Sequence, residues 1–223
     1  MRVAACLMTL CIPAVSLLAA GCPDTGASYD DFAARYDKIN PGTTVASGPS
    51  QCETPLGSDM EATGNWLFTL SVKLNPKKAF VLSAAVTAEM QDDGSMLVDM
   101  SLQPLSATDQ TTPVCGATIE FTDLPVAPDG SFAWVLAPNE TPLSLCGEAN
   151  PISMSEILTG LQIAGTICGP ADAPFACGTV TGIVEAPLPD FDLTGSSFTM
   201  QKALTDGSFP PPVLNCERAP ADF

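Results

Sequence analysis

The chain has no histidine and few basic residues. Of its 223 residues, 8 are Lys or Arg and 25 are Asp or Glu, so the formal net charge is -17. The absence of histidine excludes Ser-His-Asp and Cys-His catalysis, histidine-ligated metal sites and histidine-based pH switching. The shortage of Lys and Arg argues against nucleic-acid binding, because phosphate neutralisation needs clustered cations.

Common catalytic motifs are also missing. The sequence contains no G-x-S-x-G, H-E-x-x-H, S-x-x-K, P-loop or G-x-G-x-x-G motif. The acidic pairs Asp30/Asp31, Asp92/Asp93 and Asp190/Asp192 are candidates for calcium binding or acid–base catalysis, but none fits a D-x-D-x-D-G loop. Most of these carboxylates fall in predicted turns, where Asp is favoured by turn chemistry. We therefore expect no enzyme activity, no metal and no cofactor.

The first 21 residues have the pattern of a secretory signal peptide. Arg2 is the only charged residue before Asp24, and the segment Val3–Leu18 is almost wholly apolar. A basic start, a short apolar run and small residues before a cleavage point define such a peptide. Pro13 interrupts the run, which is short for a permanent membrane helix of about 20 residues.

The end of this segment, Leu18-Ala19-Ala20-Gly21-Cys22, resembles the lipobox of bacterial lipoproteins. The resemblance implies cleavage before Cys22, a diacylated thiol and an amino end that usually carries a further acyl chain such as palmitate. Two or three acyl chains suffice for stable anchoring. The implied partner is a membrane of the bacterial envelope. We expect the outer membrane, on its periplasmic or surface face, although Pro23-Asp24 does not distinguish inner from outer. An ordinary secretory signal with a chance cysteine is the alternative.

The lipobox interpretation assigns the nine cysteines to three groups. Two leave with the signal peptide and one is lipidated, and the even number remaining in an exported protein indicates disulfides. Six cysteines allow 15 pairings. A turn-rich loop between them favours Cys168–Cys177. Positions just outside the first and last strands favour Cys52–Cys216, and Cys115–Cys146 follows by elimination. A thiolate metal site is the disfavoured alternative, because the chain has no C-x-x-C motif.

We expect four regions along the chain: a signal peptide at 1–21, a lipidated tether at 22–28, a short helix and loop at 29–60, and a single β-domain at 61–223. The helix is predicted after Ser28 as N-cap, with acidic residues in its first turn and Lys38 in its last.

Alternation of apolar and polar residues predicts about eight short strands in the β-domain. They cover residues 65–74, 80–90, 96–103, 117–121, 132–136, 157–167, 179–185 and 191–201. Eight antiparallel strands without crossover helices form a barrel or a sandwich, and sequential hairpins favour a closed up-and-down barrel. The longer links 106–113 and 138–151 leave a β-sandwich as the alternative.

The tripeptide Gly64-Asn65-Trp66 opens the first predicted strand and resembles the Gly-x-Trp signature of lipocalins. The resemblance covers this tripeptide and the strand count. It implies a lipocalin-like barrel that binds a small apolar ligand. It also implies that Trp66 closes one barrel end beneath a basic side chain, for which Lys202 and Arg218 are the candidates. In the alternative, Trp66 is a core aromatic.

The predicted inward faces contain many small residues and methionines, which would leave room for a ligand in an eight-stranded barrel. The expected ligand-lining residues are Trp66, Phe68, Leu70, Ala84, Val86 and Met100. In the alternative, the same residues form a filled core. The sequence therefore predicts a non-enzymatic envelope lipoprotein that binds a small apolar ligand inside a barrel. A structural or protein-interaction surface module with a filled core is the second hypothesis.

Overall fold

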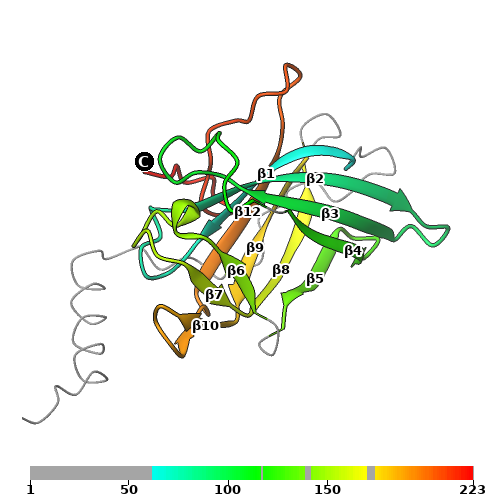
Figure 1. The fold of residues 1–223 in the computed structure, drawn as a ribbon. Helices are drawn as coiled ribbons and strands as arrows, with labels where there is room; N and C mark the ends of the chain where they lie inside the picture. The colour runs from blue at the N-terminus through cyan, green and yellow to red at the C-terminus, as the bar shows by residue number, and fades with distance from the viewer. Residues whose placement is uncertain (1–61, 117, 139–141, 170–173, 223) are drawn as a thin grey trace, which may run out of the picture. The chain divides into compact units, whose positions relative to one another are not determined.

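A computed structural model of the chain describes residues 62–116, 118–138, 142–169 and 174–222, which are almost entirely β-strands and connecting turns (Figure 1). The predicted signal peptide, lipobox and tether, and the helix and loop of 29–60, lie outside the described residues. Within the described part of the chain, no helix has the length and apolar character needed to cross a membrane.

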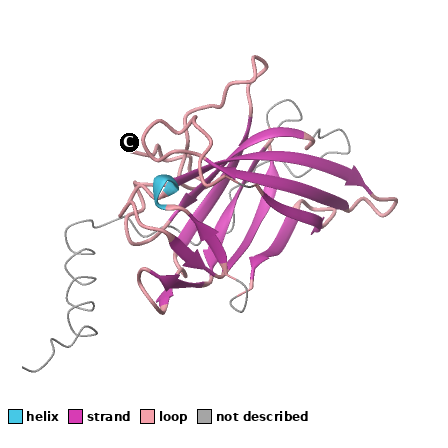
Figure 2. Cartoon of the chain, viewed as in Figure 1, coloured by secondary structure: helices cyan, strands magenta, loops and turns pink. Residues whose placement is uncertain are grey.

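The strands form two sheets (Figure 2). The large sheet has eight strands: β1 (Gly64–Ser71), β2 (Phe80–Met90), β3 (Met96–Pro104), β4 (Ile119–Val126), β5 (Ser131–Ala137), β8 (Leu161–Cys168), β9 (Phe175–Thr181) and β12 (Ser196–Lys202). The small sheet has four: β6 (Leu143–Leu145), β7 (Ile157–Thr159), β10 (Ile183–Ala186) and β11 (Phe191–Asp192). A short 3-10 helix, η1 (Gly147–Ala149), follows β6.

The large sheet is an up-and-down barrel that is nearly closed. Its strand order is β4-β3-β2-β1-β12-β9-β8-β5, with every neighbouring pair antiparallel and the first barrel strand paired with the last. The two edge strands of this sheet, β4 and β5, are joined by a tight turn, in which the Ala127 amide donates to the Ser131 carbonyl. The Trp134 indole N–H also donates to the Pro125 carbonyl across this seam, at 2.8 Å. The predicted barrel is confirmed, and the sandwich is not formed.

Three of the predicted strands are interrupted where they leave the barrel. The predicted strand 157–167 is β7 and β8, separated by Gly160, and the next one is β9 and β10, separated by Gly182. Gly182 has φ +136°, and a Cβ on it would collide with the carbonyl oxygen of Gly160. The third, 191–201, is β11 and β12 with a turn between them. Beyond these breaks the chain forms the small sheet, in the order β11-β10-β7-β6, at one end of the barrel (Figure 1).

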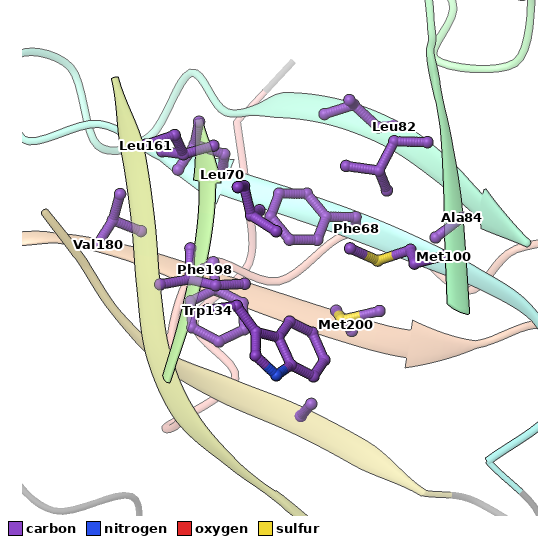
Figure 3. Close-up of a cluster of buried hydrophobic side chains, with 14 of the residues drawn as sticks. Phe68, Leu70, Leu82, Ala84, Met100, Trp134, Leu161, Val180, Phe198 and Met200 are labelled. Atoms are coloured by element: carbon purple, nitrogen blue, oxygen red, sulfur yellow. The ribbon is translucent and has the colours of Figure 1, made fainter. Parts of the chain in front are cut away.

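The interior of the barrel is filled by the inward-facing side chains of its strands (Figure 3). Phe68 and Phe198 stack with ring centroids 5.9 Å apart, and Phe132 lies 5.8 Å from Phe198. Gly165 and Gly178 face each other on β8 and β9, and a Cβ on Gly165 would lie 2.8 Å from the Phe198 ring. The space beside Gly165 is therefore occupied by an aromatic ring, whereas a Cβ on Gly178 would meet the backbone of β8.

The outer faces of β1 and β12 are covered by the segment after β12. Ser197 donates its hydroxyl hydrogen to the Leu214 carbonyl, and Thr199 donates to the Val213 carbonyl, both at 2.7 Å. Phe209 packs on an outer-face cluster of Leu67, Val81 and Leu105. Both faces of β1 and β12 are consequently buried, although the alternating sequence predicts only one.

One predicted disulfide is confirmed and two are wrong. Cys115 is bonded to Cys146 as expected, but Cys177 is bonded to Cys216, with Cα atoms 5.3 Å apart in each pair. Cys177 lies opposite Thr166 and is only a diagonal neighbour of Cys168. Diagonal Cα atoms are roughly 7–8 Å apart, too far for a disulfide. Cys168 is itself disulfide-bonded, while Cys52 lies outside the described residues.

Candidate functional site

The candidate site is an apolar pocket between one end of the barrel and the small sheet. Its volume is about 190 Å³. It is lined by Leu70, Val72, Leu74, Phe80, Leu145, Asn150, Ile152, Ser153, Ile157, Thr159, Val184, Pro187, Leu188, Phe191 and Leu193. Most of these side chains are hydrocarbon, so the pocket is an environment in which apolar groups are favoured over water.

The floor of the pocket belongs to the barrel. Leu70 lies near the end of β1, directly opposite Phe198 on β12 and Phe80 on β2. Val72 and Leu74 continue from β1 into the turn that leads to β2. Because Leu70 and Phe198 are both buried, the floor is a continuation of the packed barrel core.

The roof comes from the small sheet and its loops. Leu145 on β6, Ile157 on β7, Val184 on β10 and Phe191 on β11 each contribute a side chain. The four strands reach this position because the sheet continues past the barrel end at the Gly160 and Gly182 breaks. The Gly160 amide donates to the Ile183 carbonyl at 2.9 Å, and this hydrogen bond joins β7 to β10 at the break.

Three polar residues line the wall: Asn150, Ser153 and Thr159. Asn150 and Thr159 are buried and make their hydrogen bonds within the protein, whereas Ser153 is exposed. The Asn150 amide donates to the Ser153 hydroxyl and the Ser155 carbonyl, and its oxygen accepts from the amides of Ile152 and Ser153. The Thr159 hydroxyl lies 2.9 Å from the Gly160 carbonyl and 3.2 Å from that of Ile183. Asn150 therefore shapes the loop before β7.

A cation, Lys73, and a carboxylate, Asp192, lie beside the pocket. The Lys73 ammonium lies over the Phe191 ring, 5.3 Å from its centroid. The pKa of Asp192 is lowered by the backbone amide and the hydroxyl of Thr194, and further by the positive charge of Lys73. Nearby, Leu188 is 46% exposed and places an apolar side chain at the rim.

The small sheet is fastened to the barrel by its β6 side as well. The Cys115–Cys146 disulfide joins the loop after β3 to the residue that follows β6. The Ala107 amide donates to the Glu148 carbonyl at 2.9 Å, adding a backbone bond between the same two segments. Leu145, which lines the pocket, directly precedes the bonded Cys146, so this fastening positions part of the roof.

Of the six residues expected to line a ligand site, only Leu70 lines this pocket. The other five lie in the packed barrel core, where each is at most 6% exposed: Trp66, Phe68, Ala84, Val86 and Met100. Leu145 was missed because it falls in the predicted link 138–151, and Ile152 because it lies between that link and the next predicted strand. The glycines inside the three interrupted strands, Gly160, Gly182 and Gly195, were the available signal, because an interior glycine often marks a break or bulge.

Trp66 lies toward the other end of the barrel. Its indole N–H donates to the Ala62 carbonyl at 2.8 Å, and its cross-strand partner on β12 is Lys202. Lys202, one of the two basic candidates, therefore lies opposite Trp66 in the strand register, and Trp66 itself is part of the buried core. Arg218 instead lies over the Phe175 ring, 4.5 Å from its centroid. Phe175 belongs to the outer-face cluster of Cys168 and Cys177.

The acidic residues act mainly in turns. Asp93, Asp129 and Asp206 each accept hydrogen bonds from the amide and the hydroxyl of the serine two residues later, which lowers the pKa of each carboxyl. This agrees with the turn interpretation of the sequence. In the described ranges, no three Cys, Asp or Glu side chains gather in an arrangement that could hold a metal ion.

Comparisons with protein-family models, curated proteins and solved structures give no match to this chain.

Proposed function

We propose that this protein is a non-enzymatic, lipid-anchored protein of the bacterial envelope that holds a small apolar molecule in the pocket between the barrel and the small sheet. The observation that carries the proposal is a pocket of about 190 Å³ with hydrocarbon walls, beside a barrel interior that is otherwise packed. A folded protein rarely retains apolar space of this size, since unfilled volume costs stability.

Binding in such a pocket is driven by the transfer of apolar surface out of water. Each square ångström buried contributes about 25 cal/mol, and the fastened roof limits the ordering that a ligand must impose. The pocket is smaller than the roughly 300–1,000 Å³ typical of sites for drug-sized ligands. These features support a small hydrophobic occupant held by contact alone.

Methyl NMR tests the pocket. The protein carries 13C-labelled methyl groups and is titrated with toluene and, in a separate experiment, with palmitate. We expect saturable shifts of pocket methyls, such as those of Leu70 and Leu193, with at least one probe. In the Ile157→Trp variant a larger side chain fills the pocket, and these shifts should be lost. Val135→Trp is the matched control, because Val135 is 56% exposed on β5 and distant from the lining.

If Ile157→Trp fails to fold, Ile152→Trp fills the pocket from a half-buried loop position. The ligand proposal is refuted if neither probe produces saturable shifts in the wild-type protein. It is equally refuted if the filled variants bind as well as the Val135→Trp control does.

The membrane anchor rests on the lipobox resemblance and on Cys22, and it has a separate test. Replacing Cys22 by Ser removes the thiol that would be acylated, so the protein should leave the membrane fraction and become soluble. The strong negative charge would then prevent retention on anionic lipid. Unchanged membrane association of Cys22→Ser, in the presence of an intact domain, would contradict the anchor.

The filled barrel favours a second candidate function, a structural or protein-interaction module of the envelope. Phe68, Phe132, Trp134 and Phe198 occupy the interior in which a barrel of this strand number would hold its ligand. This candidate predicts that neither probe binds, and that Ile157→Trp retains the contacts of the wild-type protein with envelope partners in crosslinking on intact cells.

A further inference from the structure

The proposed function leaves open which apolar molecules the pocket accepts. Building on that function, we propose that the pocket selects compact, uncharged molecules about the size of one substituted ring, and that it excludes long acyl chains and anionic head groups. Three features of the site carry this inference: a closed floor, buried polar side chains that are hydrogen-bonded within the protein, and carboxylates near the rim.

The floor limits the length of a ligand. A cavity of about 150 Å³ lined by Leu, Ile and Phe holds benzene, and the present pocket, at about 190 Å³, is only slightly larger. Leu70 and Phe80 form the floor, and behind them Phe198 is 0% exposed. A long chain therefore cannot extend from the pocket into the barrel without displacing packed rings, and most of it would stay in water.

The walls limit the polarity of a ligand. Both amide hydrogens and the oxygen of Asn150 are used within its own loop, and the Thr159 hydroxyl is directed at two backbone carbonyls. A ligand hydroxyl or carboxylate placed against Asn150 or Thr159 would find no unused partner. Ser153, the third polar lining residue, is exposed, and its hydroxyl accepts from Asn150. Burial of a polar group without a hydrogen bond is unfavourable, and burial of an unpaired charge far more so.

The rim limits the charge of a ligand. The neighbouring cation, Lys73, lies over the Phe191 ring, and its positive charge contributes to the lowered pKa of Asp192. The carboxylates of Glu156, Glu185 and Asp190 are on segments next to the lining, and the whole chain carries a formal charge of -17. Anionic ligands are therefore repelled both locally and at long range.

The experiment compares four probes by methyl NMR titration of the folded, full-length domain. Toluene and benzoate share one ring and differ in charge, whereas toluene and hexylbenzene share neutrality and differ in length. Palmitate combines length and charge. We expect saturable shifts of the Leu70 and Leu193 methyls with toluene, at least tenfold weaker binding of hexylbenzene, and at least hundredfold weaker binding of benzoate and palmitate.

The possible results separate this inference from the proposed function. Tighter binding of hexylbenzene than of toluene would overturn the size limit, and equal binding of benzoate would overturn the charge limit. Palmitate as the tightest probe would overturn the inference while leaving the proposed function intact. Absence of binding by all four probes would overturn the proposed function itself. The Ile157→Trp and Val135→Trp pair identifies the pocket as the site in each titration.

Discussion

Removal of the Cys115–Cys146 disulfide should destabilise the whole domain and loosen the roof of the pocket. The bond joins the loop after β3 to the end of β6, and both cysteines are only half-buried. The double substitution Cys115→Ser and Cys146→Ser therefore introduces no fully buried hydroxyl. The change isolates the covalent link between the small sheet and the barrel.

The expected loss of stability follows from the loop that the bond closes. The two cysteines are 31 residues apart, and the chain-entropy relation for a loop of this length gives about 3.7 kcal/mol at 25 °C. The backbone bond from Ala107 to Glu148 remains in the folded state, so the native contact is weakened but not abolished. We therefore expect the free energy of unfolding to fall by about 3–4 kcal/mol.

Urea unfolding followed by circular dichroism measures this loss through the midpoint and the m-value. Hydrogen exchange should show faster opening at the amides of Ala149 and Asn150, which donate to the carbonyls of Cys146 and Gly147 beside the missing link. Cys177→Ala with Cys216→Ala is the control: its 39-residue separation predicts a similar loss of about 4 kcal/mol, with the roof amides unchanged. A loss below about 1 kcal/mol, outside the range expected for a native bond, would refute the entropic reasoning. Unchanged roof exchange would refute the fastening role.

Two further perturbations test the supports of the pocket. The amides of Thr112 and Thr111, with the Thr112 hydroxyl, lower the pKa of Asp109 to about 2. The ionised carboxylate therefore stabilises the fold above the unfolded-state pKa near 3.8. This stabilisation is lost as the pH falls through about 2. Asp109→Asn should lower the urea midpoint at pH 5 and match wild type below pH 2, and a constant difference across this range would contradict the assignment. Gly182→Ala should cost about 2 kcal/mol or more by urea unfolding, because its φ of +136° and the Gly160 carbonyl both oppose a Cβ. Gly207→Ala, which has a positive φ but open space around it, should cost less, and equal losses would show that the collision is unimportant.

The barrel was predictable because its determinants are local. Alternation along residues such as Phe68, Leu70, Leu82 and Met100 marks one buried face on each strand, and the short turns between strands restrict the chain to antiparallel neighbours. The Cys115–Cys146 bond was also predicted, although only by elimination. The two wrong pairings involve Cys177 and Cys216, which meet because the segment after β12 returns across the outer face.

The pocket was less predictable. Leu70 was named as a ligand-lining residue, but Ile152 and Phe191 line the same pocket only because the small sheet and its loops fold over the barrel end. A periodicity of two identifies which side of a strand is buried. It does not show whether the space facing that side is empty or filled by other side chains. Gly165 illustrates this point, because the space beside it is filled by the Phe198 ring from β12.

By itself, the sequence determined the all-β class, the approximate strand positions and the antiparallel barrel, since these depend on alternation and turns between near neighbours in the chain. Only the tertiary structure decided where the long strands bend at Gly160 and Gly182, which cysteines meet, and whether the barrel is filled. Those features depend on contacts between residues far apart in the chain. Tertiary packing likewise decides that the barrel interior is filled, by Phe198 among other side chains, whereas the pocket next to Leu70 stays open.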